Sequence, residues 1–374
     1  MFKFSFITRA DIAATPSGRN MLKAVDLPME GSEKHALLLT GCPGSGKTTV
    51  IAHRLANLAD QDKEYLFLFL HILLKIYLRN VMSEAGVAPD NIINIHKWFG
   101  QVFHARLTDG SEIRADYVRR RFEESSLFYD EILFDEAQDL WGDLFGTLSN
   151  ITNHITVSCD NAQDVMEQFG DHDIYNSLDG ILSKDGFQTH LVPLTTNYRN
   201  SRPIYDLAKS FIPHEQITEI NGFHRPEGEK PKLHLVNGRQ ELEKRIAVIV
   251  GNNRNVNVGI LCEKVTQIDH LYKFLTEQGI NCTKFHYRLS KEAKDAIEGN
   301  VEAVLIATLQ SAKGLEFETV IMPFIEDYSL DDKKLRQYYV GCTRAKQELH
   351  LVCSGSISQA FVQIDSSLFE NIES

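Results

Sequence analysis

The sequence predicts an α/β protein in which mainly parallel sheets are flanked by helices. Apolar runs of strand length alternate with helical segments, a pattern typical of parallel βα units. At 374 residues the chain is long enough for two or three domains, and we expect two. A second strand and helix series follows the loop-like residues 222–231, and we place the domain boundary between residues 196 and 197.

The elements expected in the first domain, residues 1–196, come from apolar runs and their flanking turns. Strands are predicted at 36–39, 64–70, 91–95, 131–134, 155–158 and 190–194, with helices at 50–58 and from about 71 to 84. In the second domain, residues 197–374, strands at 232–236, 257–261 and 302–307 alternate with helices at 240–250, 264–278 and 290–298.

The composition indicates a cytoplasmic protein that does not enter a membrane. The longest apolar run, residues 65–78, is interrupted by His71 and Lys75, so we expect no bilayer span and no membrane partner. The six cysteines are scattered and form no C-x-x-C pair, which favours reduced, packed thiols. A net charge of −12 argues weakly against nucleic acid, although the arginines at 114 and 119–121 could form a local basic patch or a solvated helix face.

A phosphate-binding pattern, G-x-x-x-x-G-K-[ST], occupies residues 41–48 between a predicted strand and a predicted helix. Its small residues Gly41, Gly44, Ser45 and Gly46 let backbone N–H groups turn toward a polyphosphate, and the helix N-terminus adds its dipole. Lys47 supplies a positive charge to the terminal phosphates, and Thr48 offers a hydroxyl to Mg²⁺. The competing interpretation is a glycine-rich turn with a coincidental Lys-Thr pair.

Two later strands end in polar side chains that suit the same chemistry. After the strand at 131–134, Asp135 is predicted to hold Mg²⁺ and Glu136 to deprotonate the attacking water. After the strand at 155–158, Gln163 is a candidate sensor of the γ-phosphate. Each has a structural alternative, since Asp135 could be a helix N-cap and Gln163 part of a capping turn.

In chain order, GCPGSGKTT, ILFDEAQD, CDNAQ, NYRN, ATLQSAKGLEF and YVGCTRAK resemble the motifs of superfamily 1 helicases of the UvrD/Rep/PcrA-like branch. The resemblance extends over residues 36–352. It implies two RecA-like lobes of the P-loop NTPase class, binding of ATP and Mg²⁺, and movement on DNA.

The resemblance also implies roles for single residues. It implies that Thr48 and Asp135 bind the metal, that Glu136 is the general base, and that Gln163 couples the γ-phosphate to DNA. It assigns Tyr198 to stacking on the base, Gly314 and Glu316 to the phosphate and ribose, and Arg199 and Arg344 to the neutralisation of charge on the γ-phosphoryl group.

The sequence departs from the family at the base and along the strand path. There is no Gln before Gln61, and Thr49 stands where an Arg often flanks the base, so other purine nucleotides stay open as substrates. Residues 69–72 have almost none of the hydrogen-bonding groups of the family's T-F-T-N motif, and Phe169 is a substitute stacking platform or a core residue. The remaining candidate strand contacts are His96, Lys97, Trp98, Thr308 and Gln310, and Trp98 is equally open as a core residue.

Two functions follow as hypotheses. The first is an NTP-hydrolysing translocase or helicase that moves 3′→5′ on single-stranded or tailed duplex DNA. The second, favoured by the sparse strand-contact motifs and the absence of large insertions, is an NTPase subunit that gates or recruits a partner such as a nuclease, as in antiviral defence, with little unwinding of its own. An RNA-directed motor is also open, whereas a nucleotide kinase leaves the KGLEF stretch and the arginines unexplained.

Overall fold

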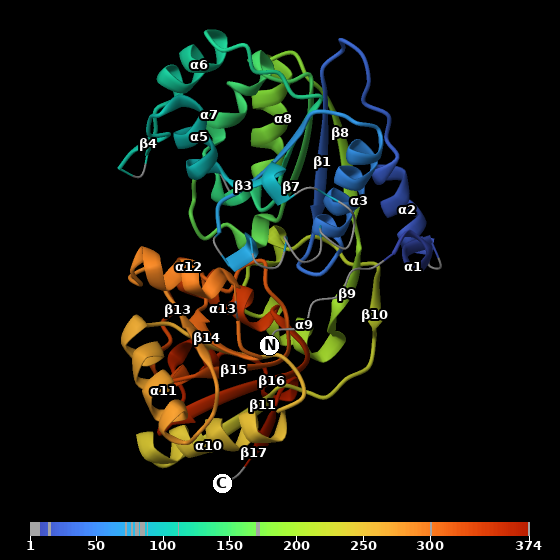
Figure 1. The fold of residues 1–374 in the computed structure, drawn as a ribbon. Coiled ribbons are helices and arrows are strands. Elements are labelled where there is room, and N and C mark those ends of the chain that lie inside the picture. The colour runs from blue at the N-terminus through green and yellow to red at the C-terminus, as the bar shows by residue number, and fades with distance from the viewer. Residues whose placement is uncertain are drawn as a thin grey trace. The chain divides into compact units, whose positions relative to one another are not determined.

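The computed structural model describes residues 8–13, 16–71, 73–75, 78, 82, 87, 89–110, 112–169, 173–299 and 301–372. The described chain divides into two compact units (Figure 1). The N-terminal unit runs to Thr196 and also contains Thr218–Asn221, and the C-terminal unit contains Asn197–Ile217 and the residues from Gly222 onward. The chain therefore returns briefly to the first unit before it completes the second.

A parallel sheet forms the centre of the N-terminal unit. Its strands lie in the order β3 (Ile92–Asn94), β2 (Tyr65–Phe69), β6 (Glu131–Phe134), β7 (His154–Cys159), β1 (His35–Gly41) and β8 (Gln188–Leu194). Each pairing runs parallel. The residues of β2, β6 and β7 are all buried, as expected where helices cover both faces of a sheet.

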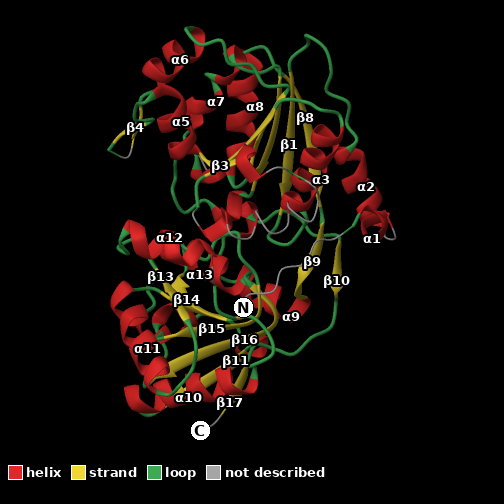
Figure 2. Ribbon diagram, viewed as in Figure 1, coloured by secondary structure: helices red, strands yellow, loops and turns green. Residues whose placement is uncertain are grey.

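Helices of this unit cover both faces of the sheet, and Figure 2 shows α3 and α8 on opposite sides of the strands. The helices are α1 (Arg9–Ala13), α2 (Pro16–Val25), α3 (Lys47–Asp60), α5 (Ile95–Phe103), α6 (Ala115–Glu123), α7 (Gly142–Phe145) and α8 (Ile174–Lys184). Short 3₁₀ turns lie at Pro89–Asn91, Ala137–Asp139, Leu148–Asn150 and Asn161–Gln163, and β4 (Thr108–Asp109) pairs antiparallel with β5 (Glu112–Ile113).

A buried ion pair fixes α3 to the start of β6. Arg54 on α3 donates from Nε and Nη2 to the two oxygens of Glu131, at 3.0 and 2.9 Å, and both side chains are at most 6% exposed. The Nη1 group of Arg54 also donates to the carbonyls of Ala24, Val25 and Leu27. Removing one partner of such a pair leaves an uncompensated charge and costs about 3–5 kcal/mol. The pair therefore holds together the two elements that carry Lys47 and Asp135.

A second parallel sheet forms the C-terminal unit. Its order is β13 (Thr283–Phe285), β14 (Val304–Thr308), β12 (Val258–Cys262), β15 (Phe317–Pro323), β16 (Ala345–Ser354), β11 (Lys232–Val236) and β17 (Glu370–Ile372). The pairings are again parallel. The two sheets confirm the predicted α/β class with mainly parallel sheets flanked by helices.

The helices of the C-terminal unit follow its strands in the expected alternation. They are α9 (Arg202–Lys209), α10 (Arg239–Asn252), α11 (Val265–Glu277), α12 (Lys291–Gly299), α13 (Asp332–Cys342) and α14 (Gln359–Val362). Short 3₁₀ turns lie at His214–Gln216, Ile325–Asp327 and Ser366–Leu368, and a two-stranded ribbon pairs β9 (Thr196–Ser201) with β10 (Gly222–Arg225).

The predicted strands are observed within one or two residues of their expected bounds, while β4, β5, β9, β10, β13, β15, β16 and β17 were not predicted. Most of the helix expected up to residue 84 lies outside the described residues, as do Ile72 and Gly170. No helix in the described part of the chain combines the length and the apolar character needed to cross a bilayer. All six cysteines are free and buried, and burial raises the pKa of Cys282 to about 11 and of Cys353 to about 12.

A buried histidine pair gives the C-terminal unit a predictable pH dependence. His234 Nε2 lies 3.0 Å from His350 Nδ1, and His350 Nε2 lies 3.0 Å from Glu348 Oε2. Burial, followed by the charges of His350, Arg245 and Lys232, lowers the pKa of His234 from 6.5 to about 4. Between these values the unfolded chain binds more protons than the folded protein, so this histidine stabilises the fold above pH 6.5 and loses that effect as the pH falls toward 4.

We therefore expect the urea concentration at the midpoint of unfolding to decrease as the pH is lowered from 6.5 to 4. The decrease should be smaller in the His234→Gln variant. The glutamine amide can donate to His350 as the histidine Nε2–H does, but it does not titrate. His190, whose pKa burial also lowers, contributes with the same sign in both proteins. If the urea midpoint changed with pH equally in wild type and variant, His234 would not be the titrating group.

Candidate nucleotide site

The phosphate loop connects β1 to α3 in the N-terminal unit. Gly44 and Gly46 adopt the left-handed backbone conformation, with φ of +76° and +96°, which suits residues without a Cβ. Lys47 is buried, and its Nζ donates to the carbonyls of Gly41 at 2.5 Å and Cys42 at 3.1 Å. A Cβ at Gly41 would lie 2.6 Å from the carbonyl oxygen of Leu194, so this position accepts only glycine without rearrangement.

The loop fits a polyphosphate. The hydroxyl of Ser45 is buried and has no hydrogen-bond partner among the residues that the structure describes. The loop also places this hydroxyl and the Lys47 ammonium at the N-terminus of α3, where the helix dipole favours an anion. The adjacent Thr49 is half-buried and follows Lys47 and Thr48 on the same helix.

Asp135 follows β6 and meets the first turn of α3. Thr48 Oγ1 donates to its Oδ2 at 2.7 Å, and Ser158 Oγ and the backbone N–H of Glu136 donate to its Oδ1. Burial raises the pKa of Asp135, and the neighbouring charge of Glu136 raises it further. A carboxylate beside a hydroxyl is the donor set that Mg²⁺ takes from proteins, with phosphate oxygens and water completing its shell.

No group of three or more histidine, cysteine, aspartate or glutamate side chains that could hold a metal occurs in the described ranges. Mg²⁺ at phosphate sites uses one or two carboxylates rather than an all-protein cage, and the Thr48–Asp135 pair offers one carboxylate and one hydroxyl. The residues present therefore fit a magnesium ion that arrives with the nucleotide.

Glu136 is held by a residue that the sequence did not single out. Glu136 has φ of +53° and is 8% exposed, and Gln138 Nε2 donates to its Oε2. Gln138 is fully buried, and its Oε1 accepts the backbone N–H of Asp160 at 3.2 Å. Gln138 thus orients Glu136 and ties the end of β6 to the end of β7.

Gln163 lies on the turn after β7 and is 1% exposed. Its Nε2 donates to Asp160 Oδ2 at 2.7 Å, while Asp160 Oδ1 accepts the backbone N–H of Ala162. Burial raises the pKa of Asp160, against the lowering effect of Lys47. The structure therefore gathers Lys47, Asp135 and Gln163 at the carboxyl ends of the neighbouring strands β1, β6 and β7.

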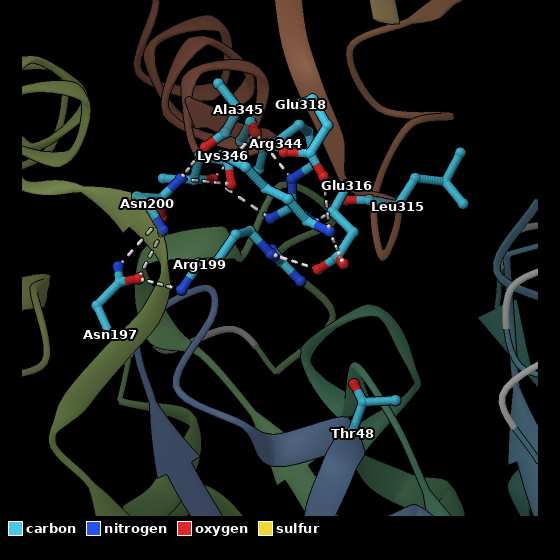
Figure 3. A network of polar contacts seen from close by, with 12 residues as sticks. Thr48, Asn197, Arg199, Asn200, Leu315, Glu316, Glu318, Arg344, Ala345 and Lys346 are labelled. Carbon is cyan, nitrogen blue, oxygen red and sulfur yellow. Dashed lines mark hydrogen bonds and ion pairs between the residues drawn. The ribbon is translucent and has the colours of Figure 1, made fainter. Parts of the chain in front are cut away.

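The arginines assigned to the γ-phosphate lie in the C-terminal unit, and Figure 3 shows their polar network. Arg199 Nε donates to Glu316 Oε2 at 2.9 Å, and Lys346 Nζ lies 2.5 Å from Glu316 Oε1. Arg344 is 1% exposed, and its guanidinium donates to the carbonyls of Val340 and Leu315 and to the hydroxyl of Thr343. The surrounding carbonyls hold the Arg344 side chain within its own unit.

Two asparagines that the sequence analysis quoted without a role connect β9 to β16. Asn197 Oδ1 accepts the backbone N–H groups of Arg199 and Asn200, each at 2.9 Å. Asn200 Nδ2 donates to the carbonyls of Thr343 at 3.1 Å and Ala345 at 2.5 Å. The asparagines therefore join the segment of Arg199 to the segment of Arg344.

The other predicted nucleotide contacts in this unit are Tyr198 and Gly314. Tyr198 is half-buried on β9, with its ring centroid 5.9 Å from that of His224. Gly314 has φ of +80°, in the left-handed region. It lies two residues before Glu316, in the loop that leads into β15.

Trp98, which the sequence left open as a strand contact or a core residue, lies in the core of the N-terminal unit. Trp98 is 4% exposed and its ring contacts Phe99, Phe103, Phe122 and Tyr129 in the core of the N-terminal unit. It therefore offers no ring face to a base. Trp98 belongs to the buried face of α5, together with Ile95, Phe99 and Phe103.

The remaining predicted strand contacts have different degrees of exposure. His96 and Lys97 are exposed at the start of α5. Phe169 is half-buried and stacks on Phe145, with centroids 6.1 Å apart. Thr308 exchanges hydrogen bonds with Ser311, and Gln310 is half-buried in the same turn.

A further departure from the family's strand path involves His71. His71 Nε2 lies 2.6 Å from Asp139 Oδ2, and Asp139 is 1% exposed. This contact uses the imidazole in an internal pair with the acidic segment after β6.

The chain matches two known domain families. Residues 26–167 match the AAA domain, and residues 303–352 match the UvrD-like helicase C-terminal domain. The RecBCD enzyme subunit RecB from Chlamydia pneumoniae is 41% identical over 58 residues, which are 15% of this chain and 6% of that protein. The chain thus matches only a small part of that relative. The C-terminal domain of a possible DNA helicase from Lactobacillus plantarum aligns with a TM-score of 0.36 and 21% identity, covering 46% of this chain and 98% of that chain.

Proposed function

Because this chain belongs to the UvrD-like superfamily 1 helicases, we propose that it couples NTP hydrolysis to 3′→5′ movement along single-stranded DNA. The observation that carries this proposal is the set of groups at the carboxyl ends of β1, β6 and β7. There Lys47, the Thr48–Asp135 pair and Glu136 combine the charge, the metal donors and the base that phosphoryl transfer needs.

In this proposal the side chains of the N-terminal unit bind the triphosphate and activate water. Lys47 exchanges its carbonyl partners for phosphate oxygens, and the Ser45 hydroxyl gains a partner. Glu136, aimed by Gln138, accepts the proton of the attacking water. Thr48 and Asp135 would hold Mg²⁺, which would supply Lewis-acid neutralisation of the charge on the phosphate oxygens. Gln163, held by Asp160, reports the state of the γ-phosphate to the strand path.

We assign Arg199 and Arg344 to the charge that develops on the γ-phosphoryl group, and Tyr198 to the base. Arginines that act on a nucleotide held elsewhere in the protein make hydrolysis depend on conformational change, which can in turn displace a strand. ATP is the proposed main substrate. GTP is also accepted in this proposal, because neither an upstream Gln nor an Arg at position 49 selects adenine.

A second candidate function is an NTPase subunit of a larger assembly. It is favoured by the burial of Trp98, by the internal use of His71, and by the local similarity to a subunit of the RecBCD enzyme. In this proposal the same hydrolytic site gates a partner such as a nuclease, and the chain alone unwinds little.

The rate of ATP hydrolysis is expected to rise strongly when single-stranded DNA is added. The measurement is steady-state phosphate release with and without a poly-dT oligonucleotide, beside displacement of a labelled strand from 3′-tailed and 5′-tailed duplexes. Stimulation with displacement of the 3′-tailed duplex supports the translocase, and stimulation without displacement supports the subunit. If RNA but not DNA raised the rate of hydrolysis, the proposed track would be RNA. If neither nucleic acid changed the rate, a nucleic-acid motor would be excluded.

A further inference from the structure

Glu316 binds two cations of its own unit, one at each carboxylate oxygen. Lys346 Nζ lies 2.5 Å from Oε1, and Arg199 Nε lies 2.9 Å from Oε2 (Figure 3). The three side chains are between 15 and 18% exposed. Both oxygens are therefore occupied by protein groups in a largely buried place.

The ion pair keeps Glu316 negatively charged. Burial alone would raise the pKa of this carboxyl, but the Arg199 and Lys346 charges outweigh it and hold the pKa at about 2. The carboxylate therefore stays ionised at any pH at which the enzyme can be assayed. Its negative charge acts on Arg199 continuously.

Arg199 is fixed at two points while the end of its side chain stays free. Its backbone N–H donates to Asn197 Oδ1 at 2.9 Å, and its Nε donates to Glu316. Neither terminal nitrogen has a hydrogen-bond partner among the residues that the structure describes. This arrangement presents the two Nη groups for another anion while the base of the guanidinium is anchored.

Lys346 explains why Arg199 is bound through Nε alone. An arginine and a carboxylate prefer a bidentate contact that uses two nitrogens and both oxygens. Lys346 occupies Oε1, so only Oε2 is left for Arg199. Lys346 is itself retained by a second carboxylate, Glu318, at 3.5 Å.

We propose that Glu316 is a positioning residue that aims Arg199 at the γ-phosphate, and that Lys346 keeps this contact monodentate. This role differs from the ribose contact that the family resemblance implies for Glu316, and it rests on the proposed role of Arg199 in hydrolysis. Without Glu316 the guanidinium loses its orientation. Without Lys346 the carboxylate becomes free to bind the terminal nitrogens that the phosphate needs.

The first test compares Glu316→Gln, Arg199→Ala and the double variant. Arg199→Ala is expected to lower kcat by about 10³-fold or more, as for other arginine fingers. Glu316→Gln is expected to lower kcat by about 10²-fold, a typical cost of misplacing a catalytic group by 1 Å, with KM for ATP unchanged. In the double variant the glutamine should add no further loss, because the residue it aims is absent.

A matched control is Glu348→Gln. Glu348 lies on β16 of the same unit, accepts from His350 and Asn253, and has a lowered pKa as Glu316 does, but it has no contact with Arg199. The kcat of the Glu348→Gln variant should equal that of wild type. Circular dichroism melting and calorimetric titration with AMPPNP report whether each variant is folded and still binds nucleotide.

The outcomes separate the inference from the function on which it rests. Wild-type turnover in Arg199→Ala would remove Arg199 from the proposed chemistry, and the inference with it. A defective Arg199→Ala beside a fully active Glu316→Gln would overturn the inference alone. A rise in KM for ATP but not for 2′-deoxyATP in Glu316→Gln would identify Glu316 as a ribose ligand and also overturn it.

The second test addresses Lys346. Lys346→Met is expected to lower kcat without changing KM, and Lys346→Arg, which keeps a cation beside Oε1, should restore part of the loss. The double variant Glu316→Gln/Lys346→Met should be no more active than the single variant Glu316→Gln. Equal activity of Lys346→Met and wild type would contradict the role given to the lysine.

Discussion

Lys47→Ala is expected to abolish measurable NTP hydrolysis. The lysine is buried in the phosphate loop, and its Nζ donates to the backbone carbonyls of Gly41 and Cys42, which phosphate oxygens can replace. Removing one positioned donor to developing charge typically costs about 10²–10³-fold in kcat, and here the loss of nucleotide affinity adds to it. The measurement is phosphate release over a range of ATP concentrations with single-stranded DNA present, so that kcat and KM are both determined.

Lys63→Ala is the matched control for this prediction. Lys63 follows the other end of α3, is 42% exposed and lies 3.7 Å from Asp130, remote from the phosphate loop in the fold. Its hydrolysis should equal that of wild type. Wild-type turnover in Lys47→Ala, with the Lys63 variant also unchanged, would mean that the phosphate site is elsewhere.

Glu136→Gln is expected to lower kcat by about 10²–10⁴-fold, the usual contribution of a general base, while nucleotide still binds. The glutamine fills the same space and can accept the hydrogen bond from Gln138, but it cannot take a proton from water. Hydrolysis and calorimetric binding of AMPPNP, measured on the same preparation, separate catalysis from affinity. Lost binding together with lost turnover would indicate a structural role for Glu136.

Asp130→Asn provides the comparison for the base. Asp130 lies immediately before β6, at the opposite end of the strand from Glu136, is 43% exposed and accepts the backbone N–H of Glu64. Its loss should leave kcat unchanged. A fall in kcat equal to that of Glu136→Gln would show that the strand is sensitive to any lost carboxylate.

The sequence predicted the strands best where apolar runs are buried on both faces. β6, whose four residues are all buried, begins and ends at the predicted residues, and β12, an apolar run that is also buried throughout, differs from its expected bounds by one residue at each end. It did not predict β17, whose residues Glu370–Ile372 alternate in no recognisable way and acquire their role by pairing with β11. That pairing joins residues far apart in the chain.

The candidate site was predictable where one short motif supplies both the residue and its setting. Asp135 follows its strand directly and Lys47 follows β1 through the phosphate loop, so their place at the carboxyl end of a sheet could be read from the chain. Gln138, Asn200 and Lys346 could not be assigned, since each acts through a partner that only the fold brings near. The sequence left Trp98 open, because an aromatic residue beside a Phe suits a core face and a binding face equally, and only the fold shows that it is buried.

The burial of all six cysteines has a practical consequence for measuring motion in this protein. Maleimide dyes react with exposed thiolates, and the native thiols are both enclosed and, for those such as Cys282 and Cys353, held protonated by a raised pKa. One cysteine introduced at exposed Val248 and another at exposed Phe128 would place a single dye on each unit without removal of any native cysteine. Fluorescence energy transfer between those dyes would follow the two units through a cycle of hydrolysis.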